Sequence, residues 1–150
     1  MEVGRSKAGI QLSQRKYALD ILSETGLLAT KPSLVPMESN SKLSKTEGPL
    51  FHGPSLYHKL VGKLLYLTNT RPDLSYSMNL LSQFLDTPRV LHYDALIKVL
   101  KYVGNGVFLP ANSTLNLVAY SDANWENCPD TCQSTTEFCV FIGNSLVSWK

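Results

Sequence analysis

Apolar residues recur every three or four positions in three segments in the middle of the chain. The segments begin near Ser55, Pro72 and Val90, and each ends at a polar or proline-containing stretch. The recurring positions are Leu56, Leu60, Leu64 and Leu67, then Leu74, Met78, Leu81 and Leu85, then Val90, Tyr93, Ile97 and Leu100. Because this spacing places side chains on one face of a helix, the sequence predicts three amphipathic helices over residues 55–103. An internal core is the favoured role of these stripes, and a partner-binding face is the alternative.

The first 30 residues combine strand-like runs with a further helical pattern. Apolar runs at residues 2–3 and 10–12 flank a glycine-bounded basic loop, which predicts a β-hairpin. Such a hairpin needs additional strands beside it to be stable. A helix is predicted over residues 14–25, with Ser13 as its N-cap and Gly26 just past its end.

The last part of the chain changes to strand-like patterns. Runs at residues 115–122, 138–142 and 146–149 are apolar or alternate in polarity, and Gly143-Asn-Ser145 is a turn signal between the last two. The sequence therefore predicts a three-stranded antiparallel sheet over residues 115–150, and an α+β fold for the whole chain.

Two stretches carry neither periodicity. Residues 31–54 and 104–114 are rich in proline, glycine and serine, which is typical of loops and linkers. They divide the chain into three units, residues 1–30, 55–103 and 115–150.

The composition is that of a folded protein with reduced surface charge. Hydrophobic residues make up 43% and charged residues 17% of the 150 positions, which excludes a disordered tail. No apolar run approaches the roughly 20 residues of a membrane span, and the first residues lack the apolar core of a signal peptide. Three cysteines, an odd number, favour free thiols and an intracellular location, cytoplasmic or nuclear.

The net charge of +2 is unevenly distributed. Residues 1–72 hold ten Lys or Arg against five acids, whereas beyond residue 106 a single lysine faces four acids. A basic front half is compatible with contacts to phosphate. The candidates for nucleic-acid binding are Arg5, Lys7, Arg15 and Lys16. The alternative is an ordinary solvated surface.

Asp122 is the main chemical candidate in the second half. It interrupts a predicted strand that is otherwise apolar at Val118, Ala119 and Tyr120. A lone buried carboxylate is very costly, so Asp122 is either solvated at an exposed strand position or a ligand to a cation such as Mg²⁺. A two-metal site needs several carboxylates, and the nearby Glu126, Asp130 and Glu137 fall in or beside a polar loop. On spacing alone, the solvated acid is favoured.

Cysteine and histidine positions do not favour a zinc site or a nucleophilic cysteine. Cys128 and Cys132 are followed by Cys139, but His52, His58 and His92 all lie far upstream. A fourth zinc ligand and a base paired with a cysteine are both missing nearby.

Several longer motifs together are similar to one known family. They are Gly9-Ile-Gln-Leu-Ser-Gln-Arg-Lys-Tyr-Ala-Leu-Asp20, Tyr57-His-Lys-Leu-Val-Gly-Lys-Leu-Leu-Tyr-Leu-Thr68, Thr70-Arg-Pro-Asp-Leu74, Asn79-Leu-Leu-Ser-Gln-Phe84, Ala119-Tyr-Ser-Asp-Ala-Asn-Trp125, Cys128-Pro-Asp-Thr131 and Ser148-Trp-Lys150. In this order they span almost the whole chain, which resembles the Pol polyprotein of plant Ty1/copia-type retrotransposons.

The resemblance implies a place for each unit. Residues 1–30 would end the palm and thumb of a reverse transcriptase, and residues 55–103 would form the connection to a ribonuclease H domain. Residues 115–150 would open that domain as the first strands of an incomplete RNase-H-like sheet. Asp122 would be its first catalytic carboxylate and an Mg²⁺ ligand, and the nucleic-acid partner would be an RNA–DNA hybrid.

The resemblance also implies a fragment without catalytic activity. The polymerase Asp-Asp motif of the family has no counterpart in this chain, and in the family the remaining nuclease acids lie beyond the position of Lys150. Asn124 stands where the family usually has Asp, so Asp122 is expected to be a vestigial ligand with no Mg²⁺ bound. The alternatives are a weak, sequence-independent nucleic-acid binding module, or a helical protein that associates with intact Pol or with itself.

Overall fold

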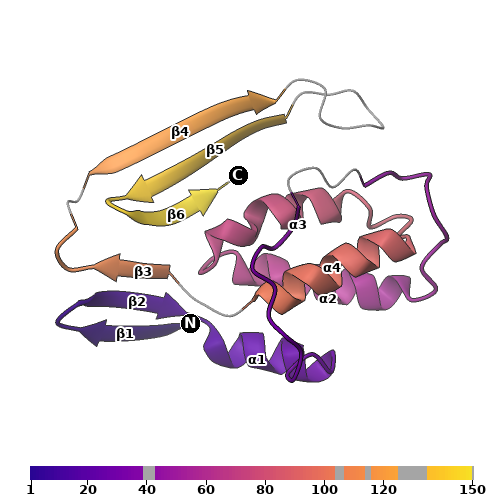
Figure 1. The fold of residues 1–150 in the computed structure, drawn as a ribbon, viewed down its shortest axis with the longest axis horizontal. Helices are drawn as coiled ribbons and strands as arrows, with labels where there is room; N and C mark the ends of the chain where they lie inside the picture. Colours follow the sequence, from indigo (N-terminus) through magenta and orange to yellow (C-terminus); the bar gives the residue numbers. More distant parts are fainter. Residues whose placement is uncertain (39–42, 104–106, 114–115, 125–134, 150) are drawn as a thin grey trace.

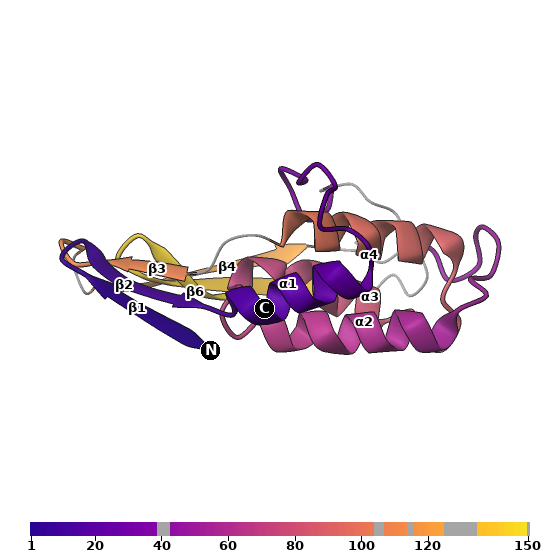
Figure 2. The same ribbon diagram turned by 90° about the horizontal axis from the view of Figure 1, so that it is seen from below.

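A computed structural model describes residues 1–38, 43–103, 107–113, 116–124 and 135–149 of the chain. A helical unit is joined to two three-stranded antiparallel sheets, which extend from one end of it (Figures 1 and 2). The predicted α+β order of an N-terminal hairpin, a helix, three further helices and a three-stranded sheet is confirmed.

The helical unit consists of α1 (Arg15–Glu24), α2 (Pro54–Leu67), the short 3₁₀ helix η1 (Pro72–Leu74), α3 (Ser75–Ser82) and α4 (Val90–Tyr102). Pro54 and Pro72 each occupy the first turn of their helix, where proline loses no backbone hydrogen bond. The helix predicted to begin at Pro72 consists of two parts, η1 and then α3.

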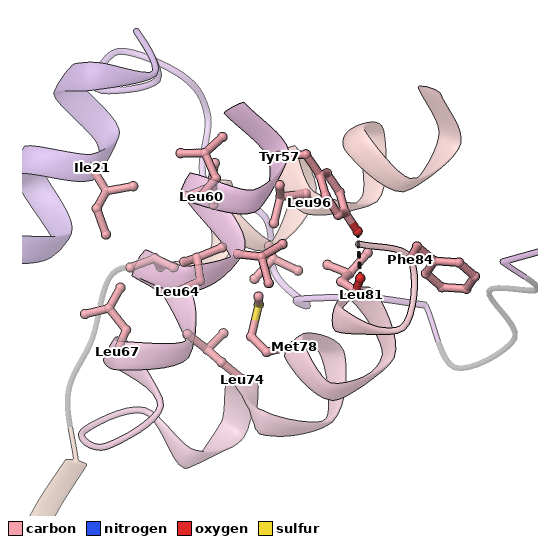
Figure 3. Close-up of a cluster of buried hydrophobic side chains, with 14 of the residues drawn as sticks. Ile21, Tyr57, Leu60, Leu64, Leu67, Leu74, Met78, Leu81, Phe84 and Leu96 are labelled. Carbon is pink, nitrogen blue, oxygen red and sulfur yellow. Dashed lines mark hydrogen bonds between the residues drawn. The ribbon is translucent and has the colours of Figure 1, made fainter. Parts of the chain in front are cut away.

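The helical stripes meet in one core, which Figure 3 shows in close-up. The buried apolar residues are Ile21, Leu43, Tyr57, Leu60, Val61, Leu64, Leu67, Leu74, Met78, Leu81, Phe84, Leu96, Val99, Leu100 and Val103. Burial of such side chains provides the main favourable free energy of folding. The first two stripes are accurate except at their ends, where Leu56 remains 41% exposed. In the third stripe only Leu100 is fully buried, and Leu96 and Val99 occupy the other core positions of that helix.

The end of α1 follows the predicted glycine signal. Gly26 has a φ of 69°. Its N–H donates to the carbonyl of Ser23, and the N–H of Leu27 donates to that of Leu22. These two bonds form a Schellman motif, which satisfies carbonyls at the end of the helix.

The start of α1 differs from the prediction by one position. The N-cap residue is Gln14 rather than Ser13, and no side chain caps the first turn. Gln14 is buried, and its side-chain oxygen accepts a hydrogen bond from the Thr70 hydroxyl at 3.2 Å. The Gln14 side chain thus makes a tertiary contact with Thr70 and does not cap the helix.

The first sheet contains a strand that lies inside a predicted linker. The hairpin of β1 (Glu2–Ser6) and β2 (Gly9–Ser13) is extended by β3 (Val107–Pro110), which pairs antiparallel with β2. This strand lies within the linker predicted over residues 104–114, and the division of the chain into units at that linker stays a prediction. Four residues ending in proline give no recognisable alternation, and only the pairing with a distant segment makes them a strand.

The second sheet is the predicted antiparallel meander. It contains β4 (Leu117–Asn124), β5 (Thr135–Ile142) and β6 (Ser145–Trp149) in that order. β5 begins at Thr135, earlier than the predicted Phe138. A two-residue turn at Gly143 and Asn144 joins β5 to β6. β6 lies beside η1 and β3, and the ring of Trp149 stacks on Tyr76 of α3 with 6.3 Å between centroids.

The segment before α2 packs against α4 although its described residues form neither helix nor strand. Leu43 is buried in the core. Ser33 donates its N–H to the carbonyl of Lys101, and Phe51 donates its N–H to that of Pro88. The division of the chain into functional units at residues 31–54 stays a prediction.

Candidate functional site

Asp122 lies in β4 with its side chain exposed to solvent. The antiparallel register pairs its backbone with that of Glu137 in β5. Side chains two positions apart on a strand share a face, so Asp122 shares its face with Tyr120, whose ring contacts Phe141 edge-on at 6.0 Å. The carboxylate thus lies at the surface of the sheet, next to an aromatic pair.

The described residues do not fit a two-metal site around Asp122. Two Mg²⁺ ions need several oxygen ligands at fixed positions. Within the described ranges, no three His, Cys, Asp or Glu side chains lie close enough together to hold a metal ion. Of the other acids considered, Glu126 and Asp130 lie outside the described residues, as do Cys128 and Cys132, and Glu137 is described only in its backbone.

The four basic candidates are separated into two pairs. Arg5 on β1 and Lys7 in the turn lie at the tip of the hairpin, whereas Arg15 and Lys16 open α1 at its other end. The five residues of β2 between them span roughly 17 Å at about 3.3 Å per residue. All four side chains are exposed, so the structure presents two small basic sites rather than one compact cluster.

Two other lysines are bound to an acid within the chain. The carboxylate of Glu24, at the end of α1, forms ion pairs with Lys59 and Lys63 of α2. Hydrogen bonds from Lys59 and then Lys63 lower the pKa of Glu24 to about 2. This arrangement links α1 to α2 and offsets the positive charge of the two lysines.

The Thr70-Arg-Pro-Asp-Leu74 motif forms a buried polar joint between α2 and α3. The guanidinium of Arg71 donates from Nε to Asp73 Oδ1 at 2.9 Å and from Nη2 to Oδ2 at 2.7 Å. Its Cζ lies 5.1 Å from the centre of the Tyr102 ring on α4. Only 8% of the Arg71 side chain is exposed. The sequence identified this motif as characteristic but did not predict its structural role, since the contact with Tyr102 depends on tertiary packing.

His92 is a second buried polar group, and its role is structural. It is fully buried and stacks on Phe84 with 3.9 Å between ring centroids. Its Nδ1 accepts from the Arg89 backbone N–H at 3.0 Å, which leaves Nε2 to donate to the carbonyl of Ser44 at 3.1 Å. Both ring nitrogens are thus occupied by the fold, which argues against a catalytic or metal-binding histidine.

Relatives of known type cover the whole chain. The chain is 42% identical over its full length to the retrovirus-related Pol polyprotein from transposon RE2 of Arabidopsis thaliana, and it spans 11% of that protein. It is 27% identical, over 97% of its length, to the retrovirus-related Pol polyprotein from transposon TNT 1-94 of Nicotiana tabacum, of which it spans 12%. The chain is a homologue of Ty1/copia retrotransposon Pol polyproteins.

The chain also has a relative that is shorter than the Pol polyproteins. An uncharacterised mitochondrial protein of Arabidopsis thaliana is 39% identical over the whole chain, which covers 64% of that protein. No model of a known protein family matches the Pol homologue, and no solved structure matches it significantly. None of its described helices is long and apolar enough to cross a membrane.

The residues in the motifs of this chain differ in where they lie in the structure. Tyr57, Leu60 and Leu64 from the second motif are core residues, and Arg71 is the centre of the buried joint. Asp122, by contrast, is an exposed acidic group on a strand.

Proposed function

We propose that this chain is the connecting region of a Ty1/copia-type Pol protein and that, as a separate chain, it has neither polymerase nor ribonuclease H activity. In this proposal the helical unit joins the end of the reverse transcriptase to the nuclease, and β4 to β6 are the first strands of an RNase-H-like sheet. Asp122 is the vestigial first carboxylate of that nuclease.

One observation carries the proposal: the chain is homologous to Pol over its full length, and its helices and strands follow one another in a particular order. The chain matches a Pol polyprotein from end to end, and a helical unit is followed by an antiparallel meander with an acid in its first strand. This order supports the placement of the chain between polymerase and nuclease that the resemblance implies. The alignment covers 11% of the Pol relative, so the activities of the whole polyprotein are carried over to this chain only as expectations.

The chemistry of the site supports inactivity. Phosphoryl transfer assisted by two metal ions depends on carboxylates that offset the charge of the ions and fix their positions. Asp122 is exposed, and the described residues contain no cluster of metal ligands. One solvated carboxylate binds Mg²⁺ too weakly to position a scissile phosphate.

The test is a cleavage assay with the complete chain. A labelled RNA–DNA hybrid incubated with Mg²⁺ or Mn²⁺ should remain intact, and a primed template with deoxynucleotides should not be extended. The matched variant Asp122→Asn separates intrinsic activity from contamination. Cleavage by the parent chain that this variant loses would refute the proposed inactivity.

The position within Pol has its own test. Reading the genomic DNA on both sides of the coding sequence should reveal polymerase-like sequence upstream and nuclease-like sequence downstream. Unrelated sequence on both sides would contradict the origin proposed here.

A second function, weak nucleic-acid binding, is supported by the two exposed basic pairs. None of Arg5, Lys7, Arg15 and Lys16 forms an ion pair with a described residue. Their charge is thus available to a phosphate backbone, and affinity should fall steeply with salt concentration.

Fluorescence anisotropy with a labelled RNA–DNA hybrid can divide this binding between the two pairs. Arg5→Ala/Lys7→Ala and Arg15→Ala/Lys16→Ala should each weaken binding and reduce the salt dependence. The control Lys31→Ala/Lys45→Ala removes the same charge from exposed positions outside both pairs. Equal losses of affinity in all three variants would show that binding depends only on the net charge of the chain.

A further inference from the structure

We propose that the outer edge of β4 pairs with β4 of a second copy of this chain, to form a two-fold dimer with a continuous six-stranded sheet. The proposal is independent of the proposed function and rests on the second sheet alone. It also differs from self-association through the helices, since it assigns the contact to a strand edge.

β4 is paired on one side only among the described residues. The sheet order is β4-β5-β6, and β5 pairs with β4 along its whole length, from Leu117 to Asn124. Figure 1 shows β4 as the outermost strand, with the helical unit and the first sheet on the other side of β5 and β6. The outward backbone N–H and C=O groups of β4 are therefore available to another strand.

This edge lacks the features that usually protect edge strands. Such strands are commonly short, bulged, or marked by lysine or proline. β4 has eight residues, Leu-Val-Ala-Tyr-Ser-Asp-Ala-Asn, without lysine or proline. The register shift in this sheet lies between Val140 and Phe141, in the pairing of β5 with β6. The ladder of β4 with β5 is regular.

Several of the side chains along this edge are apolar and exposed. Leu117 is 72% and Tyr120 62% exposed, and Val118 is 37% exposed. Phe138 on the neighbouring strand is 40% exposed and extends the apolar area. Contact with another apolar strand would remove this surface from water.

A second copy is the occupant that this edge complements best. An antiparallel pairing of two identical strands is two-fold symmetric, so every contact is made twice. If the axis passes beside Tyr120, the two tyrosines face each other, and Asp122 of each copy lies opposite Val118 of the other. The one charge among the described side chains of β4 thus avoids its own equivalent, whereas a centre at Asp122 would place two carboxylates together.

The expected dimer is weak. One pair of eight-residue strands buries less than the roughly 1,200 Å² typical of stable, specific interfaces. Association should therefore be seen at submillimolar but not at low micromolar concentration.

Sedimentation velocity across this concentration range, with reductant present to prevent disulfides, tests the proposal. The parent chain should shift from monomer to dimer, and Tyr120→Lys should abolish the shift by placing two ammonium groups at the axis. Leu34→Lys is the matched control, since Leu34 is 94% exposed and lies outside the sheet, and it should dimerise like the parent.

Circular dichroism establishes that each variant is folded. A parent chain that stays monomeric at every concentration, or a dimer that persists in folded Tyr120→Lys, would overturn the proposal. If Tyr120→Lys unfolds, hydrogen exchange of the parent chain decides. Amides of β4 should exchange more slowly at high protein concentration while those of α4 do not change, and concentration-independent exchange in β4 would refute the dimer.

Discussion

Arg71 and Asp73 hold the turn between α2 and α3 through two parallel hydrogen bonds, 2.9 and 2.7 Å long. The pair is separated by a single proline, and the guanidinium also lies against the ring of Tyr102 on α4. One side chain thus connects α2, η1 and α4 at a place where the chain reverses direction. Planar, bidentate geometry of this kind cannot be supplied by lysine.

Replacing Arg71 with lysine should destabilise the chain although the charge is kept. We expect Arg71→Lys to lower the free energy of unfolding by about 2 kcal/mol, because hydrogen bonds to a charged partner are lost from a largely buried guanidinium. Urea unfolding followed by circular dichroism measures the change. Arg15→Lys is the matched control, since Arg15 is exposed. Equal stability of both variants would show that the buried joint contributes nothing.

Tyr57 provides a separate test of the core. Its hydroxyl donates to the carbonyl of Leu81 at 2.8 Å, shown by the dashed line in Figure 3, and burial raises the pKa of this phenol. Tyr57→Phe should cost about 1 kcal/mol, the net value of one hydrogen bond, whereas Tyr57→Ala should cost about 3–5 kcal/mol through the cavity it leaves. Thermal unfolding measures the stability of both variants. An equal loss of stability in Tyr57→Phe and Tyr57→Ala would contradict this account.

The ion pairs of Glu24 predict a dependence of stability on acid. The pKa of Glu24 lies below its ordinary value of 4.5, at about 2. A lowered pKa stabilises the folded state fully above pH 4.5, and this contribution disappears as the pH falls towards 2. Glu24→Gln should therefore be less stable than the parent near neutral pH, and the difference should shrink over that acidic range.

Unfolding curves of Glu24→Gln at several pH values and salt concentrations provide the measurement. Salt should also reduce the difference, because the three side chains are partly exposed. Asp20→Asn, at an exposed position on the same helix, is the control and should not lose stability. A pH-independent difference for Glu24→Gln would mean that the ion pairs are not its cause.

Two glycines should respond oppositely to alanine. A methyl group at Gly62, exposed within α2, would meet nothing within 4 Å, whereas one at Gly9 would collide with the Leu109 carbonyl oxygen. Gly62→Ala should stabilise the chain by about 0.5–1 kcal/mol through helix propensity. Gly9→Ala should destabilise it by about 1–3 kcal/mol through overpacking. Calorimetry measures both changes in stability. An unchanged stability of Gly9→Ala would contradict the pairing of β2 with β3.

The features that can be predicted from the sequence are those that depend on residues close together in the chain. The spacing of Leu60, Leu64 and Leu67 is sufficient to place α2, and Gly26 marks the end of α1. The strand β3 was not predictable, because its four residues carry no alternation and depend on β2, far away in the sequence. Tertiary pairing overrides local propensity in such short segments.

The candidate site follows the same division. The sequence places Asp122 in a strand, which is correct, but whether the acid ever binds Mg²⁺ in a longer protein stays a prediction. The buried roles of Arg71 and His92 were not foreseen, since each depends on partners from other elements. A proline between two opposite charges, as in Arg71-Pro-Asp73, was the one available signal for the polar joint.

The position of β3 determines the order in which this chain can fold during synthesis. Ile10 pairs with Leu109, so the hairpin leaves the ribosome long before its third strand, and all four α-helices are translated in between. The helical core can assemble first, because its contacts are complete once α4 has emerged. The first sheet is then closed against a helical unit that has already formed, and the strands of the second sheet are translated later still.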